Sequence, residues 1–294
     1  MRPYSRVYAT VNLDAVASNM RSMRDNLPAS TLIMGSVKAD GYGHGSVPVA
    51  KTIEPYVFGY AVATIDEGII LRRHGINKTI LILGVTHESR YEDLLRYDIR
   101  TAMFQYEKAK KLSDLALKQG KKAVVHLALD TGMSRIGMKA DREHAKEAAA
   151  IAALEGIEVE GLFTHFARAD ETDKSAYEEQ YRRYKEFLGY LKELGVKIPI
   201  RHCSNSAGIV ESLESNHMDM VRAGIAIYGM YPSDEVDHNS VKLTPAMEIK
   251  SCITYIKEIE AGTAVSYGGT FVADHTMKVA TIPVGYGDGY VRSL

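Results

Sequence analysis

The sequence predicts an α/β fold: a (βα)8 TIM-type barrel followed by a smaller antiparallel β domain that is incomplete at its C-terminus. Nearly continuous apolar runs alternate with helical patterns, and about eight such units fit between Thr31 and about residue 230. Alternating β-branched segments without helical patterns then follow a polar linker. We therefore expect an N-terminal strand in residues 1–14 that is associated with the β domain, a barrel over 15–235, and the β domain over 236–294.

Each element has its own signal. Tyr8 to Leu13 is predicted to be a short strand, and Asp14 is predicted to cap a helix that ends near Met23. The apolar runs predict barrel strands at Leu32–Val37, Val57–Val62, Thr79–Leu83, Arg100–Phe104, Ala123–Leu129, Val159–Phe163, Pro199–Cys203 and Met218–Tyr228. Helices are predicted at Ser46–Glu54, Asp66–His74, Glu88–Tyr97, Glu107–Gln119, Asp141–Leu154, Lys174–Leu194 and Ser206–Glu214. In the β domain, strands are predicted at Ile249–Ile256, Thr263–Val265 and Val279–Val284.

The composition argues against several classes of protein. The 294 residues include 36 Lys and Arg and 37 Asp and Glu, a balance that does not favour binding to nucleic acid or a membrane surface. No apolar run approaches the roughly 20 residues of a membrane helix, and the N-terminus lacks a hydrophobic signal core. Cys203 and Cys252 form no metal-spacing motif, so we expect no metal site and a cytoplasmic location.

Lys38 ends an apolar strand and is followed by the glycine-rich stretch Gly41-Tyr42-Gly43-His44-Gly45. In α/β barrels the carboxyl ends of the strands carry the chemistry, and an amine there can condense with an aldehyde. An ordinary surface lysine in a glycine loop explains this stretch equally well.

Other strand ends also carry polar residues. The planar fork of Arg135 suits a substrate carboxylate, although a salt bridge at a helix start would explain it equally well. His165 could stack on a cofactor or be a buried structural histidine. Asn205 and Ser206 could cap a helix or help to form a phosphate site, to which Gly224 would allow close backbone approach. Arg222 lies in an apolar run, where a lone cation is costly unless it is paired.

The ordered set of motifs resembles the alanine racemases, which are fold type III pyridoxal-phosphate enzymes. The matching segments, which span nearly the whole chain, are Val37-Lys38-Ala39, Gly41-Tyr42-Gly43-His44-Gly45, Asp130-Thr131-Gly132-Met133, Arg135, Thr164-His165, Asn205-Ser206, Val221-Arg222-Ala223-Gly224, Ser266-Tyr267-Gly268 and Gly285-Tyr286.

The resemblance implies a racemase that interconverts L- and D-alanine and supplies D-alanine for peptidoglycan. It places pyridoxal 5'-phosphate on Lys38 and Arg135 at the substrate carboxylate. The other cofactor-binding residues that it implies are Tyr42, His165, Asn205, Ser206, Arg222, Gly224 and Ile225, with Arg222 facing the pyridine nitrogen. It also implies a head-to-tail homodimer in which Tyr267 completes the partner's site.

Racemisation removes a proton from one face of Cα and returns one on the other face. By this resemblance Lys38 serves the D enantiomer and Tyr267 the L enantiomer. Because a phenol has an ordinary pKa of about 10, Tyr267 needs cationic neighbours, for which the candidates are Arg135 and, if it is protonated, His165.

Two departures from the family pattern stand out. Many members have a carbamylated lysine seven positions before the arginine, where this chain has Ala128, so we expect a small anion such as chloride or a neighbouring side chain to position Arg135. Members also continue past the glycine-tyrosine turn, so we expect a truncated β domain here. The alternatives left open are a serine or broad-specificity racemase of the same family, a non-catalytic pyridoxal-phosphate-binding barrel, and a Schiff-base aldolase on the same barrel, which would need the lysine but not Tyr267.

Overall fold

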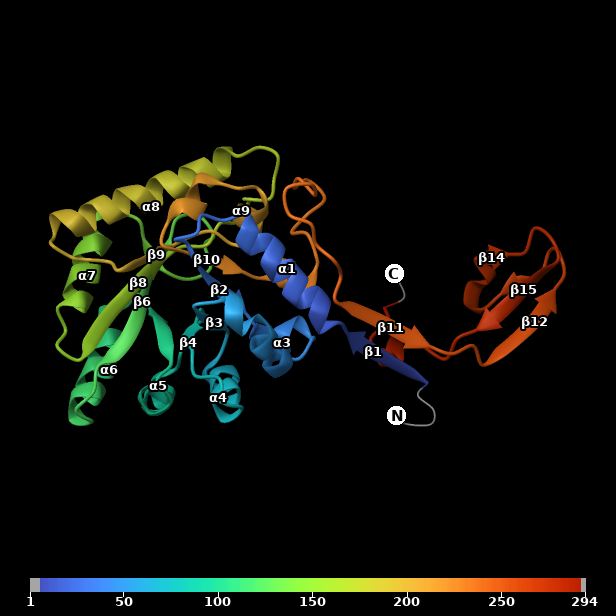
Figure 1. The fold of residues 1–294 in the computed structure, drawn as a ribbon, viewed down its shortest axis with the longest axis horizontal. Coiled ribbons are helices and arrows are strands. Elements are labelled where there is room, and N and C mark those ends of the chain that lie inside the picture. Colours follow the sequence, from blue (N-terminus) through green and yellow to red (C-terminus); the bar gives the residue numbers. More distant parts are fainter. Residues whose placement is uncertain (1–5, 292–294) are drawn as a thin grey trace. The chain divides into compact units, whose positions relative to one another are not determined.

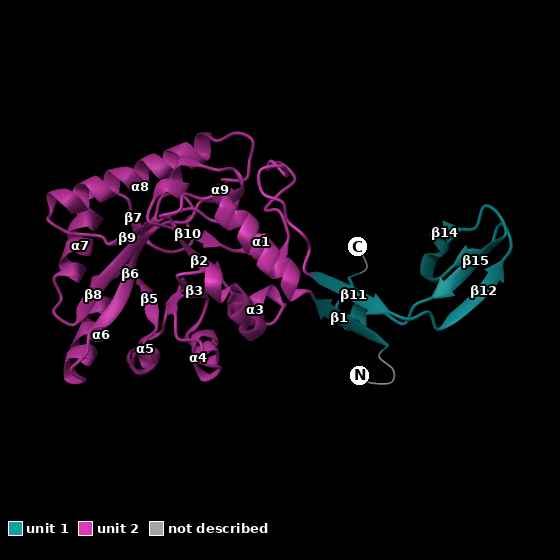
Figure 2. Cartoon of the chain, in the orientation of Figure 1, with its two compact units in different colours: residues 1–11, 247–294 teal, residues 12–246 magenta. Residues whose placement is uncertain are grey.

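The computed structural model describes residues 6–291 and divides the chain into two compact units (Figure 2). One unit is Asn12–Ala246, and the other combines the described parts of 1–11 and 247–294. Two short segments lie outside the described residues. They are residues 1–5, at the start of the predicted N-terminal segment, and residues 292–294, at the end that was predicted to be incomplete.

The larger unit is a closed parallel barrel, as predicted (Figure 1). Its strands follow the order β5-β4-β3-β2-β10-β9-β8-β6, and the pairing of β5 with β6 closes the ring. Their bounds are β2 Leu32–Ser36, β3 Gly59–Val62, β4 Thr79–Ile82, β5 Arg100–Met103, β6 Ala123–Asp130, β8 Ile157–Phe163, β9 Ile200–His202 and β10 Met220–Ala223. A two-residue strand, β7 Met138–Lys139, pairs with the end of β6.

Helices surround the barrel strands (Figure 1). Their bounds are α1 Leu13–Asp25, α2 Lys38–Tyr42, α3 Ser46–Ile53, α4 Ile65–Arg73, α5 Tyr91–Tyr97, α6 Tyr106–Lys118, α7 Arg142–Ala152, α8 Ser175–Glu193 and α9 Ser206–Val210. The cap of α1 is Asn12 and not Asp14 as predicted, because the Asn12 side chain accepts the N–H of Ala15 at 3.1 Å. Asp14 instead lies in the first turn, where its charge favours the helix N-terminus.

The last barrel strand is shorter than its apolar run. The prediction of one strand over Met218–Tyr228 was wrong, since β10 ends at Ala223 and a 3₁₀ helix, Ile225–Tyr228, follows Gly224. Ala226, Ile227 and Tyr228 are buried like the strand residues, so the sequence shows one uninterrupted apolar stretch.

The segment that follows the 3₁₀ helix packs on the barrel. Val236, Val241 and Ala246 are buried in the core of the larger unit, which therefore ends later than the expected residue 235. Asn19 of α1 fastens this segment: its Nδ2 donates to the carbonyls of Ile227 at 3.1 Å and Thr244 at 2.9 Å, and its Oδ1 accepts the N–H of Thr244 at 2.8 Å.

The smaller unit consists of antiparallel strand pairs, as predicted. Strand β1 (Val7–Val11) pairs with β11 (Met247–Ser251), β12 (Tyr255–Ile259) with β15 (Met277–Thr281), and β13 (Ala264–Val265) with β14 (Phe271–Val272). The predicted strand Ile249–Ile256 is thus two strands, interrupted at residues 252–254. No helix among residues 6–291 is both long and apolar enough to cross a membrane.

We expect Asn19→Ala to lower the free energy of unfolding by about 2–4 kcal/mol, because it leaves two carbonyls and one N–H without their buried partner. Chemical denaturation measures the change. Ser18→Ala, on the exposed face of the same helix, is the control, and equal stability of the two variants would contradict the role of Asn19.

Candidate active site

A cavity of about 470 Å³ opens in the barrel unit and contains residues that follow several different strands. It is lined by every predicted site residue except Tyr267: Lys38, Tyr42, Arg135, His165, Asn205, Ser206, Arg222, Gly224 and Ile225. Tyr267 belongs to the smaller unit, where it begins a short 3₁₀ helix, Tyr267–Gly269, and its side chain is 83% exposed. The carboxyl ends of the barrel strands thus gather nine of the ten predicted residues.

Lys38 begins α2 two residues after the end of β2, and the residues that follow it form a left-handed turn. Ala39, Asp40 and Tyr42 adopt φ values of 50°, 49° and 54°, although side chains with a Cβ disfavour this region by about 1–2 kcal/mol per residue. Asp40 Oδ1 accepts the N–H of Ser46 at 2.8 Å, and Glu67 Oε1 accepts the N–H of Ala39 at 2.8 Å. These bonds hold the strained turn that presents the lysine.

Glu67 was not predicted as a site residue. Its second carboxylate oxygen accepts the N–H of Ala63 at 2.7 Å, and it forms a capping box with Thr64 at the start of α4. The sequence T-x-x-E is a helix-start signal, but nothing in it indicates a bond to the turn after Lys38.

Two hydroxyls converge beside Gly224. Ser206 Oγ accepts the N–H of Gly224 at 2.9 Å, and a Cβ placed on Gly224 would stand 3.5 Å from both Ser206 Oγ and Tyr42 Oη. The absence of a side chain at Gly224 therefore leaves a niche between the two hydroxyls. Such a niche fits a phosphate group, which accepts hydrogen bonds from hydroxyls.

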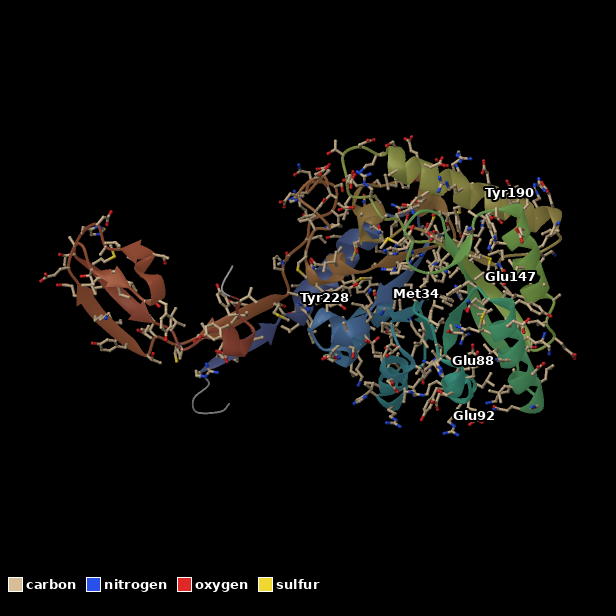
Figure 3. All side chains as sticks on the ribbon, turned by 180° about the vertical axis from the view of Figure 1, so that it is seen from behind. Met34, Glu88, Glu92, Glu147, Tyr190 and Tyr228 are labelled. Atoms are coloured by element: carbon tan, nitrogen blue, oxygen red, sulfur yellow. The ribbon has the colours of Figure 1, made fainter. Side chains whose placement is uncertain are left out.

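The ring of Tyr42 has a rigid support. It lies against Tyr228 (labelled in Figure 3), with the ring centroids 5.0 Å apart, and Tyr228 Oη donates to the Ser36 carbonyl at 2.9 Å. Lys38 Nζ lies 5.8 Å from the centroid of the Tyr42 ring. Asn205 has a structural task, because its Oδ1 accepts the N–H of Gly208 at 3.2 Å and caps α9.

Arg222 is buried, with only 3% of its surface exposed, and it is satisfied by carbonyls and imidazoles. Its guanidinium donates to the carbonyls of Thr164 at 2.7 Å, Cys203 at 3.0 Å and His202 at 3.2 Å, and to His202 Nδ1 at 2.9 Å. Burial lowers the pKa of Arg222 to about 10, so the group remains cationic near neutral pH.

His165 is a neutral acceptor. Its Nδ1 lies 3.3 Å from Arg222 Nη2, which can only donate. Desolvation, followed by the charges of Arg222, Arg135 and Lys38, lowers the pKa of His165 to about 3. A protonated His165 is therefore disfavoured near neutral pH, and Arg135 remains as the candidate cation.

Arg135 is exposed at the edge of the cavity, and it has no ion pair among the described residues. Asp130 shapes its loop by accepting the N–H groups of Gly132 at 2.9 Å and Ser134 at 3.0 Å. Ala128 is buried in an apolar cluster with Ala102 and Phe163. The lining holds three basic residues, Lys38, Arg135 and Arg222, against one carboxylate, Asp170, so the cavity suits a negatively charged ligand.

Three residues behind Arg222 were not predicted as site residues. His126 Nδ1 lies 2.8 Å from His202 Nε2, and His126 Nε2 lies 2.9 Å from a carboxylate oxygen of Glu160. These residues lie within three strands, β6, β8 and β9, and come together only when those strands pair in the sheet, so no local pattern could have found the arrangement. Among the described residues, no group of three or more His, Cys, Asp or Glu side chains is placed to hold a metal ion.

Comparison with known proteins gives consistent matches. The family model of the alanine racemase N-terminal domain matches residues 11–232, and that of the alanine racemase C-terminal domain matches residues 246–294. The alanine racemase of Desulforamulus reducens is 43% identical over 289 residues, which are 98% of this chain and 78% of that protein.

Solved structures of alanine racemases also match this chain. The alanine racemase of Clostridium difficile 630 matches with a TM-score of 0.91 and 41% identity, covering 99% of this chain and 76% of that one. Its complex with cycloserine matches with a TM-score of 0.89 and 40% identity, over the same shares of the two chains.

We expect His165→Gln to flatten the dependence of stability on pH between pH 6.5 and 5. In the wild-type protein the unfolded chain binds a proton at this histidine below about pH 6.5 and the folded chain does not, so stability falls as the pH falls. The difference in slope between variant and wild type should approach about 1.4 kcal/mol per pH unit toward pH 5, as measured by denaturation at several pH values. His275→Gln, whose side chain is 71% exposed, is the control, and an unchanged slope in His165→Gln would show that His165 does take up a proton.

Proposed function

This chain belongs to the alanine racemase family, and we propose that it interconverts L- and D-alanine with pyridoxal phosphate bound in the cavity of the barrel. The observation that carries the proposal is the convergence of an amine, two hydroxyls beside a glycine, and two arginines on one cavity. The D-alanine produced would serve peptidoglycan synthesis.

The residues present fit the cofactor. Lys38 supplies the amine for its aldehyde, and the niche formed by Tyr42, Ser206 and Gly224 suits its phosphate. When bound, pyridoxal phosphate holds the substrate amine and accepts the electron pair that a departing Cα proton leaves behind. We assign Arg222 to the pyridine nitrogen, with His165 and His202 among the acceptors that hold its guanidinium.

The chain's own side chains move the proton. We propose that Lys38 Nζ takes and returns it on the face used by D-alanine, and that Tyr267 Oη does so on the face used by L-alanine. Arg135 holds the substrate carboxylate through its planar fork. Because His165 is neutral, the positive charge that favours an ionised phenol comes from Arg135. We further propose that a small anion such as chloride lies against Arg135, which has no described ion pair.

Tyr267 is assigned to the site of the other subunit in a head-to-tail homodimer. Its ring is largely exposed in the unit that carries it, which is consistent with a partner that covers it. Each barrel would then be completed by the partner's Tyr267.

We expect Tyr267→Phe to affect proton exchange from L-alanine and from D-alanine differently. Racemisation should fall by about 10²–10⁴-fold, because the phenol that serves one face is lost. Exchange of the α-proton of D-alanine with D₂O should persist, whereas exchange from L-alanine should be lost, as measured by proton NMR. Lys38→Ala should lose both exchanges, and Tyr255→Phe, on β12, is the control. Equal loss of both exchanges in Tyr267→Phe would contradict the two-base assignment, and failure of the wild-type protein to racemise alanine would reject the proposed function.

Mixing two inactive variants tests the homodimer. If each barrel uses its own Lys38 and the partner's Tyr267, a dimer of Lys38→Ala with Tyr267→Phe contains one intact site. After random exchange of subunits, half of the dimers are mixed, so activity should return to about a quarter of the wild-type value. No recovery after verified subunit exchange would place Tyr267 in the site of its own chain.

A further inference from the structure

A line of hydrogen-bonded side chains leads from Arg222 through the barrel wall. Arg222 Nη1 lies 2.9 Å from His202 Nδ1, His202 Nε2 lies 2.8 Å from His126 Nδ1, and His126 Nε2 lies 2.9 Å from Glu160 Oε2. The four residues come from β10, β9, β6 and β8. His126 and His202 are fully buried, so no water is needed to complete the line.

Each hydrogen bond in this line has one possible direction. A guanidinium only donates, so His202 Nδ1 accepts and its proton stands on Nε2. That proton is donated to His126 Nδ1, which places the proton of His126 on Nε2. His126 then donates to Glu160, a carboxylate that only accepts. Both imidazoles thus turn the negative ends of their dipoles toward Arg222.

The backbone is adapted to this arrangement. The pairing of β6 with β8 shifts between Val125 and His126, so that Val125 stands opposite Val159 and His126 opposite Gly161. Glu160 is the extra residue of this bulge, and a bulge can redirect a side chain. A Cβ on Gly161 would stand 2.4 Å from His126 Nδ1, so only glycine leaves room for the imidazole there.

Glu160 is held as a carboxylate at the outer end. Arg100 approaches it with Nε 3.4 Å from Oε2 and Nη2 3.5 Å from Oε1, and Arg100 also pairs with Asp98 at 2.9 Å. Burial opposes its ionisation, but the hydrogen bond from His126 and the charge of Arg100 outweigh this and keep the pKa of Glu160 below its ordinary value.

The groups whose charges act directly on Arg222 do not supply a counter-charge. Burial raises the pKa of Cys203 to about 12 and that of Tyr184 well above its ordinary value, so both are neutral near pH 7. Arg135 is a second cation, and His165 is neutral. Desolvation and the charge of Arg222 keep the pKa of His202 far below its usual value, and desolvation lowers that of His126. Among the described residues, the negative charge that this line of hydrogen bonds connects to Arg222 is the carboxylate of Glu160.

We propose that Glu160 is a positioning residue that holds Arg222 as a hydrogen-bond-donating cation, acting through two neutral histidines of fixed tautomer. This inference rests on the proposed function for its kinetic consequence, because Arg222 is assigned there to the cofactor. The arrangement of protons along the line is a property of the protein alone.

The first test reads these protons directly. In protein labelled with ¹⁵N-histidine, the N–H···N bond at 2.8 Å should give a ¹⁵N–¹⁵N coupling, and it is the one hydrogen bond between two imidazoles among the described residues. We expect both coupled rings to be neutral and protonated on Nε2 from pH 6 to 9. An Nδ1-protonated or doubly protonated ring in this pair would overturn the proposal. The measurement needs no variant and no substrate, so it remains decisive even if a variant fails to fold.

The second test removes the charge. Glu160→Gln keeps the shape of the side chain, and Glu158→Gln makes the same change at an exposed position of the same strand. We expect Glu160→Gln to lower kcat for alanine racemisation about tenfold and to change KM less than about twofold. The basic limb of its pH profile should move down by about one pH unit, because Arg222 loses its remote negative charge. Glu158→Gln should match the wild type.

A folded Glu160→Gln protein with the wild-type kcat and pH profile would overturn the proposal, even if its stability were lower. Absence of racemisation by the wild-type protein would reject the proposed function instead, and the histidine coupling would still decide the arrangement of the protons.

Discussion

The structure depends on keeping one cation inside the barrel wall. A buried guanidinium without partners would be strongly destabilising, so its surroundings must supply acceptors in the right places. Three strand carbonyls and two imidazoles do this for Arg222. Because the carbonyls lie where β8 and β9 end, Arg222 is satisfied only when β8, β9 and β10 pair side by side. That pairing also places the residues that follow these strands at the mouth of the cavity.

The side of the cavity that carries Lys38 is positioned by a strained backbone turn and not by a buried charge. There the chain accepts strain, since Ala39, Asp40 and Tyr42 adopt left-handed backbone angles that most residues avoid. The carboxylates of Asp40 and Glu67 bind the backbone N–H groups of Ser46 and Ala39 and so oppose relaxation of the turn. The burial of a charge thus positions the residues on one side of the cavity, and a strained turn positions those on the other. Both features lie at the ends of strands, where the backbone is no longer held by the hydrogen bonds of the sheet.

Much of the fold could be predicted from the sequence because apolar runs and helical periodicity are local signals. Residues that follow strands, such as Lys38 and His165, could be assigned to one edge of the barrel, since all its strands run parallel. Other features depend on contacts between distant segments. The sequence could not show that Tyr228 ends a buried 3₁₀ helix, or that His126 meets Glu160 across a bulge. Nor could the sequence show that His165 is desolvated and lies near the charges of Arg222, Arg135 and Lys38, which together lower its pKa.

The pairing of β1 with β11 has a consequence for the order in which the chain folds. Val7–Val11 leaves the ribosome before any barrel strand, but its partner Met247–Ser251 appears only after the whole of Asn12–Ala246 has been made. The barrel can therefore close cotranslationally while β1 is an unpaired strand with exposed backbone donors and acceptors. Until β11 is synthesised, β1 of each nascent chain keeps an unpaired edge. Neighbouring nascent chains on the same mRNA would carry the same edge. Protection of this strand by a chaperone would matter most during that interval.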